Sequence, residues 1–296
     1  MLLFAGLDGG ASKTRVRIVD TSGALIGEGN AGPGSLTISP EFAAANALKA
    51  LEQALMGSGF SLADCRLVCG LAGHRQPERC AVFKDLMSDV GAIEVISDGY
   101  AALLGAHGGA PGAIVIAGTG SAGLSLDLDD KVRQIGGWGP VAGDEGGGNW
   151  LGRQAVRLAL RAHDLETVSG SKPPALLEAI YKELGGKHET ILTWLANADA
   201  TRFGGLAPII VQHAEHGDLV AQALLNEAAS EISRLILLAS DDGRLPVALI
   251  GGLVDILAPR IDQAFSPTSP LGCSLDGALR RASGIAPPEV YHQKAA

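Results

Sequence analysis

The sequence predicts an α/β protein in which one arrangement of strands occurs twice. Residues 8–29 and residues 117–137 each show a strand, a small-residue turn, a second strand, a tight turn and a third strand. Helical periodicity dominates much of the remaining second half, over residues 149–162, 174–184 and 219–238. We interpret the two strand segments as a duplication of structure rather than of sequence. With 296 residues, the chain is long enough for two domains, which we expect at residues 1–111 and 112–296.

The composition indicates a folded protein and argues against some classes of binding partner. Hydrophobic residues make up 47% of the chain and charged residues 19%, which excludes a disordered protein. The net charge of −9, without a basic stripe, argues against binding to duplex nucleic acid. The longest apolar run, Val247 to Leu257, has 11 residues and contains Asp255, so no membrane span is expected. The chain starts without a cationic signal-peptide region and its four cysteines form no CxxC pair, so we expect a cytoplasmic protein.

In the first half, each predicted element has its own local signal. Residues 2–7 form an apolar strand, residues 14–19 alternate apolar residues with arginines as a strand does, and residues 24–27 form a third strand. Ser39-Pro40 predicts a helix N-cap followed by proline in the first turn. This helix is expected to bury a face of apolar residues spaced by 3 and 4, namely Phe42, Ala45, Leu48, Leu51 and Leu55. Two further strands at 67–71 and 93–97 and a helix at 99–106 follow.

The second half repeats the strand plan before its helices. Strands are predicted at 113–117, 124–128 and 131–135, and a last strand at 247–250 runs into Gly251-Gly252. Residues 266–271 contain two prolines and are expected to form a loop, and a final helix is expected at 275–282.

Two familiar nucleotide motifs are present only in part. Residues 118–123 read G-x-G-x-x-G, but a dinucleotide fingerprint requires these glycines to open a helix, and here the alternating residues of a strand follow. Residues 9–14 end in Lys-Thr like a P-loop, but Ser12 stands where a P-loop has glycine, and again a strand follows. The sequence therefore argues against a Rossmann site and against a Walker A site.

What remains is a turn of glycines and hydroxyl residues between two strands at equivalent places in each half. Either turn alone can be a simple hairpin, but such turns can also present successive backbone N–H groups to an anion. Their occurrence at both places favours phosphate binding, with two turns holding a triphosphate from both sides.

Acidic residues accompany these turns. Asp98 ends a predicted strand and precedes a helix, where it can serve as the helix N-cap or, at the carboxyl end of a strand, as a general base. Residues 136–148 include seven glycines in thirteen positions, which suits close approach of the backbone to a ligand. In this segment Trp138 offers a flat apolar face. Asp144 and Glu145 can accept hydrogen bonds from hydroxyl groups, can favour the start of the next helix, or can do both.

Four motifs are found together in this chain: Asp8-Gly9-Gly10, Ile96-Ser97-Asp98, Gly118-Thr119-Gly120-Ser121 and the GGWG…GDEG pattern of residues 136–146. This combination resembles the N-acetylglucosamine and glucosamine kinases of the BadF/BadG/BcrA/BcrD group, which belongs to the actin–hexokinase–Hsp70 ATPase superfamily. The resemblance covers essentially the whole chain. It implies two ribonuclease-H-like α/β domains around a cleft, the second with helical insertions. It also implies a homodimeric enzyme that transfers the γ-phosphoryl group of Mg-ATP to the 6-hydroxyl of an amino sugar.

The resemblance also implies residue roles. Asp98 matches the base that activates the sugar 6-hydroxyl, and Asp8 is the carboxylate expected near Mg²⁺. The residues expected to bind the sugar are Trp138, Gly139, Asp144 and Glu145, together with Ser35, which stands where similar kinases carry an asparagine. The residues expected to bind ATP belong to the two turns and an adenosine loop: Gly9, Gly10, Ser12, Lys13, Gly118, Thr119, Gly120, Ser121, Gly251 and Gly252.

Alternatives remain open. Ser35 leaves the identity of the sugar undecided, and N-acetylmuramic acid is a further candidate acceptor. An ATPase that activates 2-hydroxyacyl-CoA dehydratases is an alternative from another class, although such proteins hold an iron–sulfur cluster and no cysteine lies between Cys80 and Cys273 here. A sugar-responsive repressor is not expected, because the first turn begins already at Asp8. His213 and His216 are expected on a solvated helix face rather than at a metal site.

Overall fold

The computed structural model describes residues 1–262 and 264–291. The chain forms two compact units: unit 1 comprises Met1–Ile114, Leu124–Arg133 and the residues from Ser269 onward, and unit 2 comprises Val115–Gly123 and Gln134–Thr268. The expected division into residues 1–111 and 112–296 stays a prediction, because the units are not continuous in sequence: Leu124–Arg133 and the C-terminal segment both group with unit 1. For the C-terminal segment the contacts of one helix are decisive. Helix α11 (Ser274–Ala282) packs against strands of the first sheet and against helix α3 (Asp98–Ala106).

Unit 1 contains a five-stranded mixed sheet of order β3-β2-β1-β4-β5. Its strands are β1 (Leu3–Gly9), β2 (Thr14–Val19), β3 (Leu25–Ala31), β4 (Cys65–Leu71) and β5 (Ala92–Ser97). The first three strands form an antiparallel meander, and β4 and β5 pair in parallel with β1 and with each other. The predicted strands are confirmed, except that Asp8 and Gly9 are the last residues of β1 rather than part of the turn.

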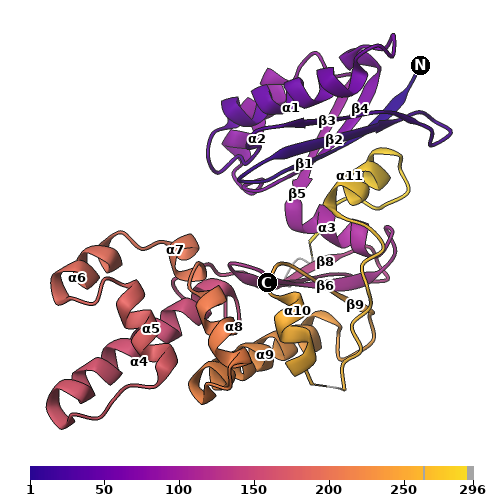
Figure 1. The fold of residues 1–296 in the computed structure, drawn as a ribbon. Helices are drawn as coiled ribbons and strands as arrows, with labels where there is room; N and C mark the ends of the chain where they lie inside the picture. Colours follow the sequence, from indigo (N-terminus) through magenta and orange to yellow (C-terminus); the bar gives the residue numbers. More distant parts are fainter. Residues whose placement is uncertain (263, 292–296) are drawn as a thin grey trace. The chain divides into compact units, whose positions relative to one another are not determined.

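The two faces of this sheet are covered by different helices (Figure 1). The register places Gly6, Arg17 and Glu28 side by side and so on one face. Arg17 pairs with Asp276 of α11, with 2.6 Å between Nη1 and Oδ1, so α11 lies on this face. Its backbone comes close, because a Cβ added to Gly6 would lie 2.7 Å from a backbone nitrogen of α11.

Helix α1 (Pro40–Leu55) covers the opposite face and begins as predicted, with the Ser39 hydroxyl accepting the Phe42 N–H at 3.2 Å. The expected buried face was partly wrong: Phe42 is 68% exposed, and Ala45 is exposed as well. Most of the buried positions are alanines, because α1 packs directly onto glycines of β3. A Cβ added to Gly29 would lie only 1.9 Å from the carbonyl oxygen of Ala50. At that separation of the backbones only small side chains fit between helix and sheet.

Two further elements complete unit 1. Helix α2 (Pro77–Leu86) was not predicted; it packs against α1 and buries Phe83 completely. Helix α3 follows β5 directly, as predicted.

A second sheet repeats the plan of the first. Its strands β6 (Gly112–Ala117), β7 (Ser121–Leu126), β8 (Val132–Gly136) and β9 (Val247–Ile250) have the order β8-β7-β6-β9. In both sheets the three meander strands lie in reverse order and a later strand follows beside the first of them. The predicted duplication and the α/β class are therefore confirmed.

The helices of unit 2 occupy the long segment between β8 and β9 (Figure 1). Helices α4 (Gly148–Ser169), α5 (Ala175–Glu183) and α9 (Leu219–Ala239) lie at predicted positions. Helices α6 (His188–Ala196), α7 (Ala200–Gly204) and α8 (Ala207–Glu215) were not predicted, and α10 (Val254–Leu257) follows β9. Across the described residues, no helix combines the length and the apolar character that crossing a membrane requires.

Candidate functional site

The first glycine turn joins β1 to β2 in unit 1. The Gly10 N–H donates to the Lys13 carbonyl at 3.0 Å and closes the turn. The carbonyls of Gly9 and Gly10 accept N–H groups from two neighbouring loops, from Ala72 at 3.4 Å and from Gly34 at 2.9 Å. Three carbonyl oxygens of the turn are thus already satisfied by the protein.

The second glycine turn joins β6 to β7 in unit 2 and shows the same pattern. The Gly118 N–H donates to the Gly120 carbonyl at 3.0 Å. The carbonyls of Gly118 and Thr119 accept the N–H groups of Gly148 and Asn149 at the start of α4, both at 2.8 Å. The two turns are therefore equivalent in topology and similar in hydrogen bonding, although the closing bond spans three residues in the first turn and two in the second.

This pattern favours anion binding at both turns. Carbonyl oxygens repel an anion, and here they are directed to protein donors, so a phosphate group at either turn would meet mainly N–H groups and glycine Cα atoms. Ser12 and Lys13 in the first turn and Thr119 in the second are exposed and add hydroxyl and ammonium donors. Ser121 differs, because its hydroxyl donates to the Glu145 carbonyl at 2.6 Å and is committed to the protein.

Asp8 lies next to the first turn and is paired with Arg15, with 2.7 Å between Asp8 Oδ2 and Arg15 Nη2. The hydrogen bond to Asp8 raises the pKa of Arg15. Protein-bound Mg²⁺ commonly takes one or two carboxylates together with substrate phosphates and waters. Asp8 still offers Oδ1, so it fits as one ligand of a phosphate-bound Mg²⁺. An all-protein site does not fit, because the described residues contain no cluster of three or more His, Cys, Asp or Glu that could hold a metal ion.

Asp98 is the first residue of α3, at the carboxyl end of β5. The helix is capped by Ser97, whose hydroxyl accepts the Tyr100 N–H at 2.8 Å, so the alternative role of Asp98 as the N-cap is wrong. The Asp98 side chain is exposed, and its Oδ1 accepts the adjacent Gly99 N–H at 2.9 Å. No ion pair to Asp98 occurs in the described part of the chain. Such a carboxylate is free to accept a proton from a hydroxyl group placed against it.

Ser35 lies in the loop that supports the first turn through Gly34. It is 4% exposed, and its hydroxyl oxygen accepts the Thr37 N–H at 3.2 Å. Arg79 holds this loop by donating to the carbonyls of Leu36 at 2.6 Å and Thr37 at 2.8 Å. The structure thus brings Ser35 beside the first glycine turn, the predicted phosphate turn of unit 1, with its O–H still available as a donor.

The glycine-rich segment 136–148 is held by side chains of α4. Asn149 donates to the Pro140 carbonyl at 3.2 Å, and Arg153 contacts the same carbonyl and donates to that of Val141 at 3.2 Å. These bonds offset part of the entropy that ordering so many glycines costs. Trp138, beside Gly139, is 82% exposed and offers its ring to a ligand.

Asp144 connects this segment with the second turn. Its backbone is left-handed, with φ of 60°, and a Cβ added to Gly120 would lie 2.6 Å from its Oδ2. Partial burial raises the pKa of Asp144, although N–H groups of Ser121 and Gly139 act in the opposite direction. A carboxyl group predicted to bind the sugar therefore lies against the second glycine turn, which is predicted to bind phosphate.

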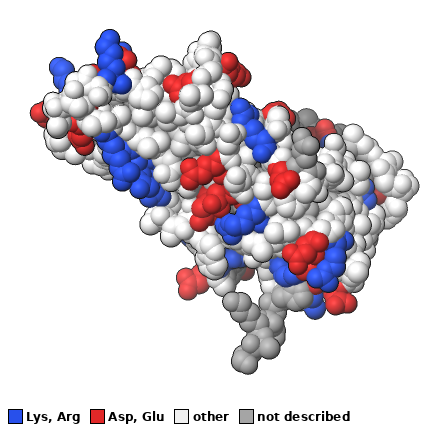
Figure 2. Space-filling view, turned by 90° about the horizontal axis from the view of Figure 1, so that it is seen from below, with Lys and Arg blue, Asp and Glu red and all other residues white. Residues whose placement is uncertain are grey.

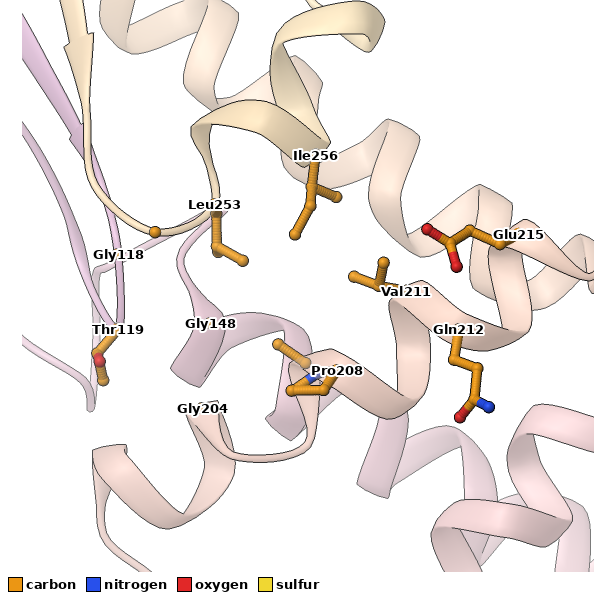
Figure 3. A pocket seen from close by; sticks show the side chains of 12 residues that line it. Gly118, Thr119, Gly148, Gly204, Pro208, Val211, Gln212, Glu215, Leu253 and Ile256 are labelled. Atoms are coloured by element: carbon orange, nitrogen blue, oxygen red, sulfur yellow. The ribbon is translucent and has the colours of Figure 1, made fainter.

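A pocket of about 710 Å³ opens beside the second turn in unit 2 (Figure 3). Gly118 and Thr119 form one part of its wall, and Gly252, Leu253 and Ile256 form the next. The two parts are joined, because the Leu253 N–H donates to the carbonyl of Ala117 at 3.0 Å. The structure thus brings the predicted second phosphate turn and the predicted adenosine loop together in one pocket.

The remaining wall comes from α7 and α8, and sequence reasoning missed it. It consists of Gly204, Ala207, Pro208, Val211, Gln212 and Glu215, and Gly148 at the start of α4 also lines the pocket. Figure 3 shows Leu253 and Ile256 on one side and Pro208 and Val211 on the other. The only sequence signal for α8 was the apolar run around Pro208, which is too short to identify a helix by its period. An apolar slot of this volume with a few polar groups is typical of small-molecule sites.

Charged side chains of both signs lie near one another on one face of the molecule. On the face shown in Figure 2, Lys and Arg side chains form separate groups among Asp and Glu rather than a continuous basic band. His213 lies on α8 and His216 caps its end, where His216 Nδ1 is 2.7 Å from the Gln212 carbonyl.

Comparisons with known proteins show which family the chain resembles. A family model described as the BadF/BadG/BcrA/BcrD ATPase family matches residues 5–263. A glucosamine kinase from Vibrio cholerae is 30% identical over 287 residues, which cover 94% of this chain and 95% of that protein. An N-acetylmuramic acid/N-acetylglucosamine kinase from Clostridium acetobutylicum is 29% identical over 234 residues, covering 77% and 76% respectively. A solved structure from Chromobacterium violaceum, assigned as an N-acetylglucosamine kinase, is 31% identical with a TM-score of 0.83, covering 95% of this chain and 99% of that one.

Proposed function

The chain belongs to the BadF/BadG/BcrA/BcrD ATPase family, and we propose that it is an amino-sugar kinase that transfers the γ-phosphoryl group of ATP to the 6-hydroxyl of glucosamine or N-acetylglucosamine. The names of the relatives from Vibrio cholerae and Chromobacterium violaceum support this acceptor class. The observation that carries the ATP assignment is the pocket of unit 2, where an apolar slot opens directly beside a backbone anion turn. This combination suits a purine base attached to a polyphosphate.

The turns and Asp98 then have separate tasks. Phosphoryl transfer requires mainly positioning of the reactants and stabilisation of charge on the phosphate oxygens, which N–H groups of the two turns supply. Asp98 orients the sugar 6-hydroxyl and accepts its proton. The 6-oxygen forms a bond to the γ-phosphorus, the bond from this phosphorus to the bridging oxygen breaks, and ADP leaves with that electron pair.

The metal and sugar assignments belong to the same proposal. Asp8 is the residue that would hold Mg²⁺, which neutralises negative charge on the phosphate oxygens when it is bound. Trp138 provides a face for the sugar ring, and Asp144, Glu145 and Ser35 are assigned to its polar groups. A homodimer is also expected from the family resemblance, and light scattering of the purified protein tests it.

The first experiment measures ADP release from Mg-ATP without sugar and then with glucosamine, N-acetylglucosamine, N-acetylmuramic acid and glucose. Strong stimulation by one amino sugar supports the kinase and identifies its acceptor. Stimulation by N-acetylmuramic acid alone would transfer the assignment to that sugar, as the name of the Clostridium relative allows. Sugar-independent turnover would contradict the kinase assignment.

The second experiment tests the base. Asp98→Asn is expected to lose nearly all phosphoryl transfer, about 100-fold or more, while ATP binding is retained. Asp85→Asn is the matched control, because Asp85 is an exposed carboxylate of α2 in the same unit. A tenth or more of the wild-type activity in Asp98→Asn would remove Asp98 from the base role.

A further inference from the structure

We propose that Glu289, near the C-terminal end of the described residues, is a positioning residue for Asp98. The proposal rests on the base role assigned to Asp98 above, and it adds a residue that no sequence motif indicated. Glu289 and Asp98 lie in the same unit, as do all the contacts that follow.

Glu289 binds both polar groups of the residue that precedes Asp98. Its Oε2 accepts the backbone N–H of Ser97 at 2.9 Å, and its Oε1 accepts the Ser97 hydroxyl at 2.7 Å. The oxygen of the same hydroxyl accepts the Tyr100 N–H in the first turn of α3. Attachment at two points fixes the backbone and the side chain of Ser97, and therefore the place at which Asp98 leaves β5 and begins the helix.

The Glu289 carboxylate is nearly enclosed, with 9% of its side chain exposed. Besides Ser97, the hydroxyl of Tyr291 donates to Oε1 at 2.7 Å, and His74 Nε2 lies 3.8 Å from the same oxygen. A carboxylate is withdrawn from water at a high cost unless its oxygens are hydrogen-bonded, and here three donors bind it. A serine N-cap requires only its own hydroxyl, so starting α3 does not by itself explain this buried acid.

The segment that carries Glu289 is itself held in unit 1. We call residues 287–291 the C-terminal strap. The buried Tyr100 donates its hydroxyl to the Pro287 carbonyl at 2.9 Å, and the Val132 N–H donates to the Val290 carbonyl at 2.7 Å. The strap is thus fixed to α3 and to the start of β8 independently of Ser97. Glu289 can therefore hold Ser97 in place rather than follow its movement.

The consequence concerns the rate of the chemical step. Asp98 is exposed and accepts only the neighbouring Gly99 N–H in the described chain, so its position depends on the backbone at Ser97. A reacting group displaced by about 1 Å can cost about 100-fold in rate. Loosening Ser97 should therefore lower kcat with the amino sugar and leave the KM for ATP almost unchanged.

The test compares two isosteric substitutions. Glu289→Gln turns one of the oxygens that bind Ser97 into a donor. The control is Glu94→Gln: Glu94 lies on β5, the strand that contains Ser97, and this substitution removes an ion pair with Arg281 whose atoms lie 3.0 Å apart. We expect kcat to fall about 10- to 100-fold in Glu289→Gln and to stay near the wild-type value in Glu94→Gln. Amide hydrogen exchange at residues 97–100, measured without substrate, should be faster in Glu289→Gln only.

A double-substitution cycle shows whether Glu289 acts through Ser97. Ser97→Ala should also lower kcat, and the double variant Ser97→Ala/Glu289→Gln should then lose much less than the product of the two single losses. Fully multiplicative losses would overturn the proposal. If Glu289→Gln does not fold, Tyr291→Phe removes one donor from Oε1 and should still lower kcat several-fold; wild-type kcat in that variant would overturn the proposal as well.

The outcomes separate this proposal from the one on which it rests. If Asp98→Asn keeps a tenth or more of the activity, the base assignment fails, while faster exchange at residues 97–100 in Glu289→Gln would still demonstrate the attachment. If Asp98→Asn is inactive but Glu289→Gln has wild-type kcat, the positioning role is wrong and the base role stands.

Discussion

Replacing Gly251 by alanine should distort the pocket of unit 2, and the size of the resulting loss of stability follows from the local geometry. Gly251 has φ of 118°, a conformation that is open almost only to glycine. A Cβ at this position would lie 2.3 Å from the carbonyl oxygen of Ala117, the acceptor for the Leu253 N–H. The substitution therefore strains the backbone and displaces the link between the adenosine loop and the second phosphate turn.

The expected loss of stability in Gly251→Ala has two parts. A residue forced into such a backbone region costs about 1–3 kcal/mol, and relieving the overlap with Ala117 costs about 1–3 kcal/mol more. Gly251→Ala should thus destabilise the protein by about 2–6 kcal/mol. In the molecules that still fold, the distorted pocket should bind ATP less well. A loss of about 1.4 kcal/mol in the free energy of binding corresponds to a tenfold weaker affinity for ATP.

Gly252→Ala is the matched control for this change. Gly252 has no positive φ, and a Cβ added there would meet no heavy atom within 4 Å. Urea unfolding should show a large loss of stability in Gly251→Ala and almost none in Gly252→Ala, and titration with ATP should show the loss of affinity in the folded Gly251→Ala protein. Equal unfolding midpoints in the two variants, or an ATP affinity of folded Gly251→Ala equal to that of the wild type, would refute the reasoning.

Other substitutions test the packing and the sugar site. Gly29→Ala should lower the free energy of unfolding by about 2–4 kcal/mol in a urea titration, because its Cβ would lie 1.9 Å from a backbone oxygen of α1. Phe42→Ala is the control: this side chain is 68% exposed, and its removal should change the free energy of unfolding by less than about 0.5 kcal/mol. Trp138→Ala should raise the KM for the amino sugar about tenfold at an unchanged unfolding midpoint, since the ring is 82% exposed, and an unchanged KM would exclude a sugar contact. Burial alone would raise the pKa of Asp276, but the Cys273 N–H and the Arg17 guanidinium hold it below its usual value. The resulting stabilisation is present above the unfolded-state pKa of about 4 and is lost as the pH falls through the folded-state value, so Asp276→Asn should flatten the loss of stability below about pH 4.

The positions of most strands could be predicted from the sequence, but the packing of α1 could not. Ser39-Pro40 is a local signal, and the helix begins there. The buried face depends instead on what the helix meets, and an apolar pattern favours large residues such as Phe42. The glycines of β3 bring the two backbones so close that alanines are buried and Phe42 is left outside. Only the pairing of helix and strand, a long-range feature, determines this outcome.

The same distinction applies to the candidate site. The positions of the two glycine turns could be predicted because their signal is local: each consists of glycine and hydroxyl residues, and each is followed by a strand. The donors that bind their carbonyls come from distant segments and could not be predicted. The wall of the unit 2 pocket that comes from α8 could not be predicted, since Pro208 and Val211 line the pocket only when α8 lies opposite Leu253. Glu289 lies still further from any motif, because its role depends on a hydrogen bond between distant parts of the chain.

The assignment of Asp98 shows why cap geometry matters for the function. An aspartate after a strand and before a helix is commonly the N-cap, and its carboxylate is then occupied by N–H groups of the first turn. In this protein Ser97 takes that role, and Glu289 in turn binds Ser97. The division of tasks keeps the Asp98 carboxylate exposed at the carboxyl end of β5 while its backbone is held from both sides. A general base must be both accessible and well positioned, and a serine cap bound by a buried carboxylate meets both requirements better than an aspartate cap would.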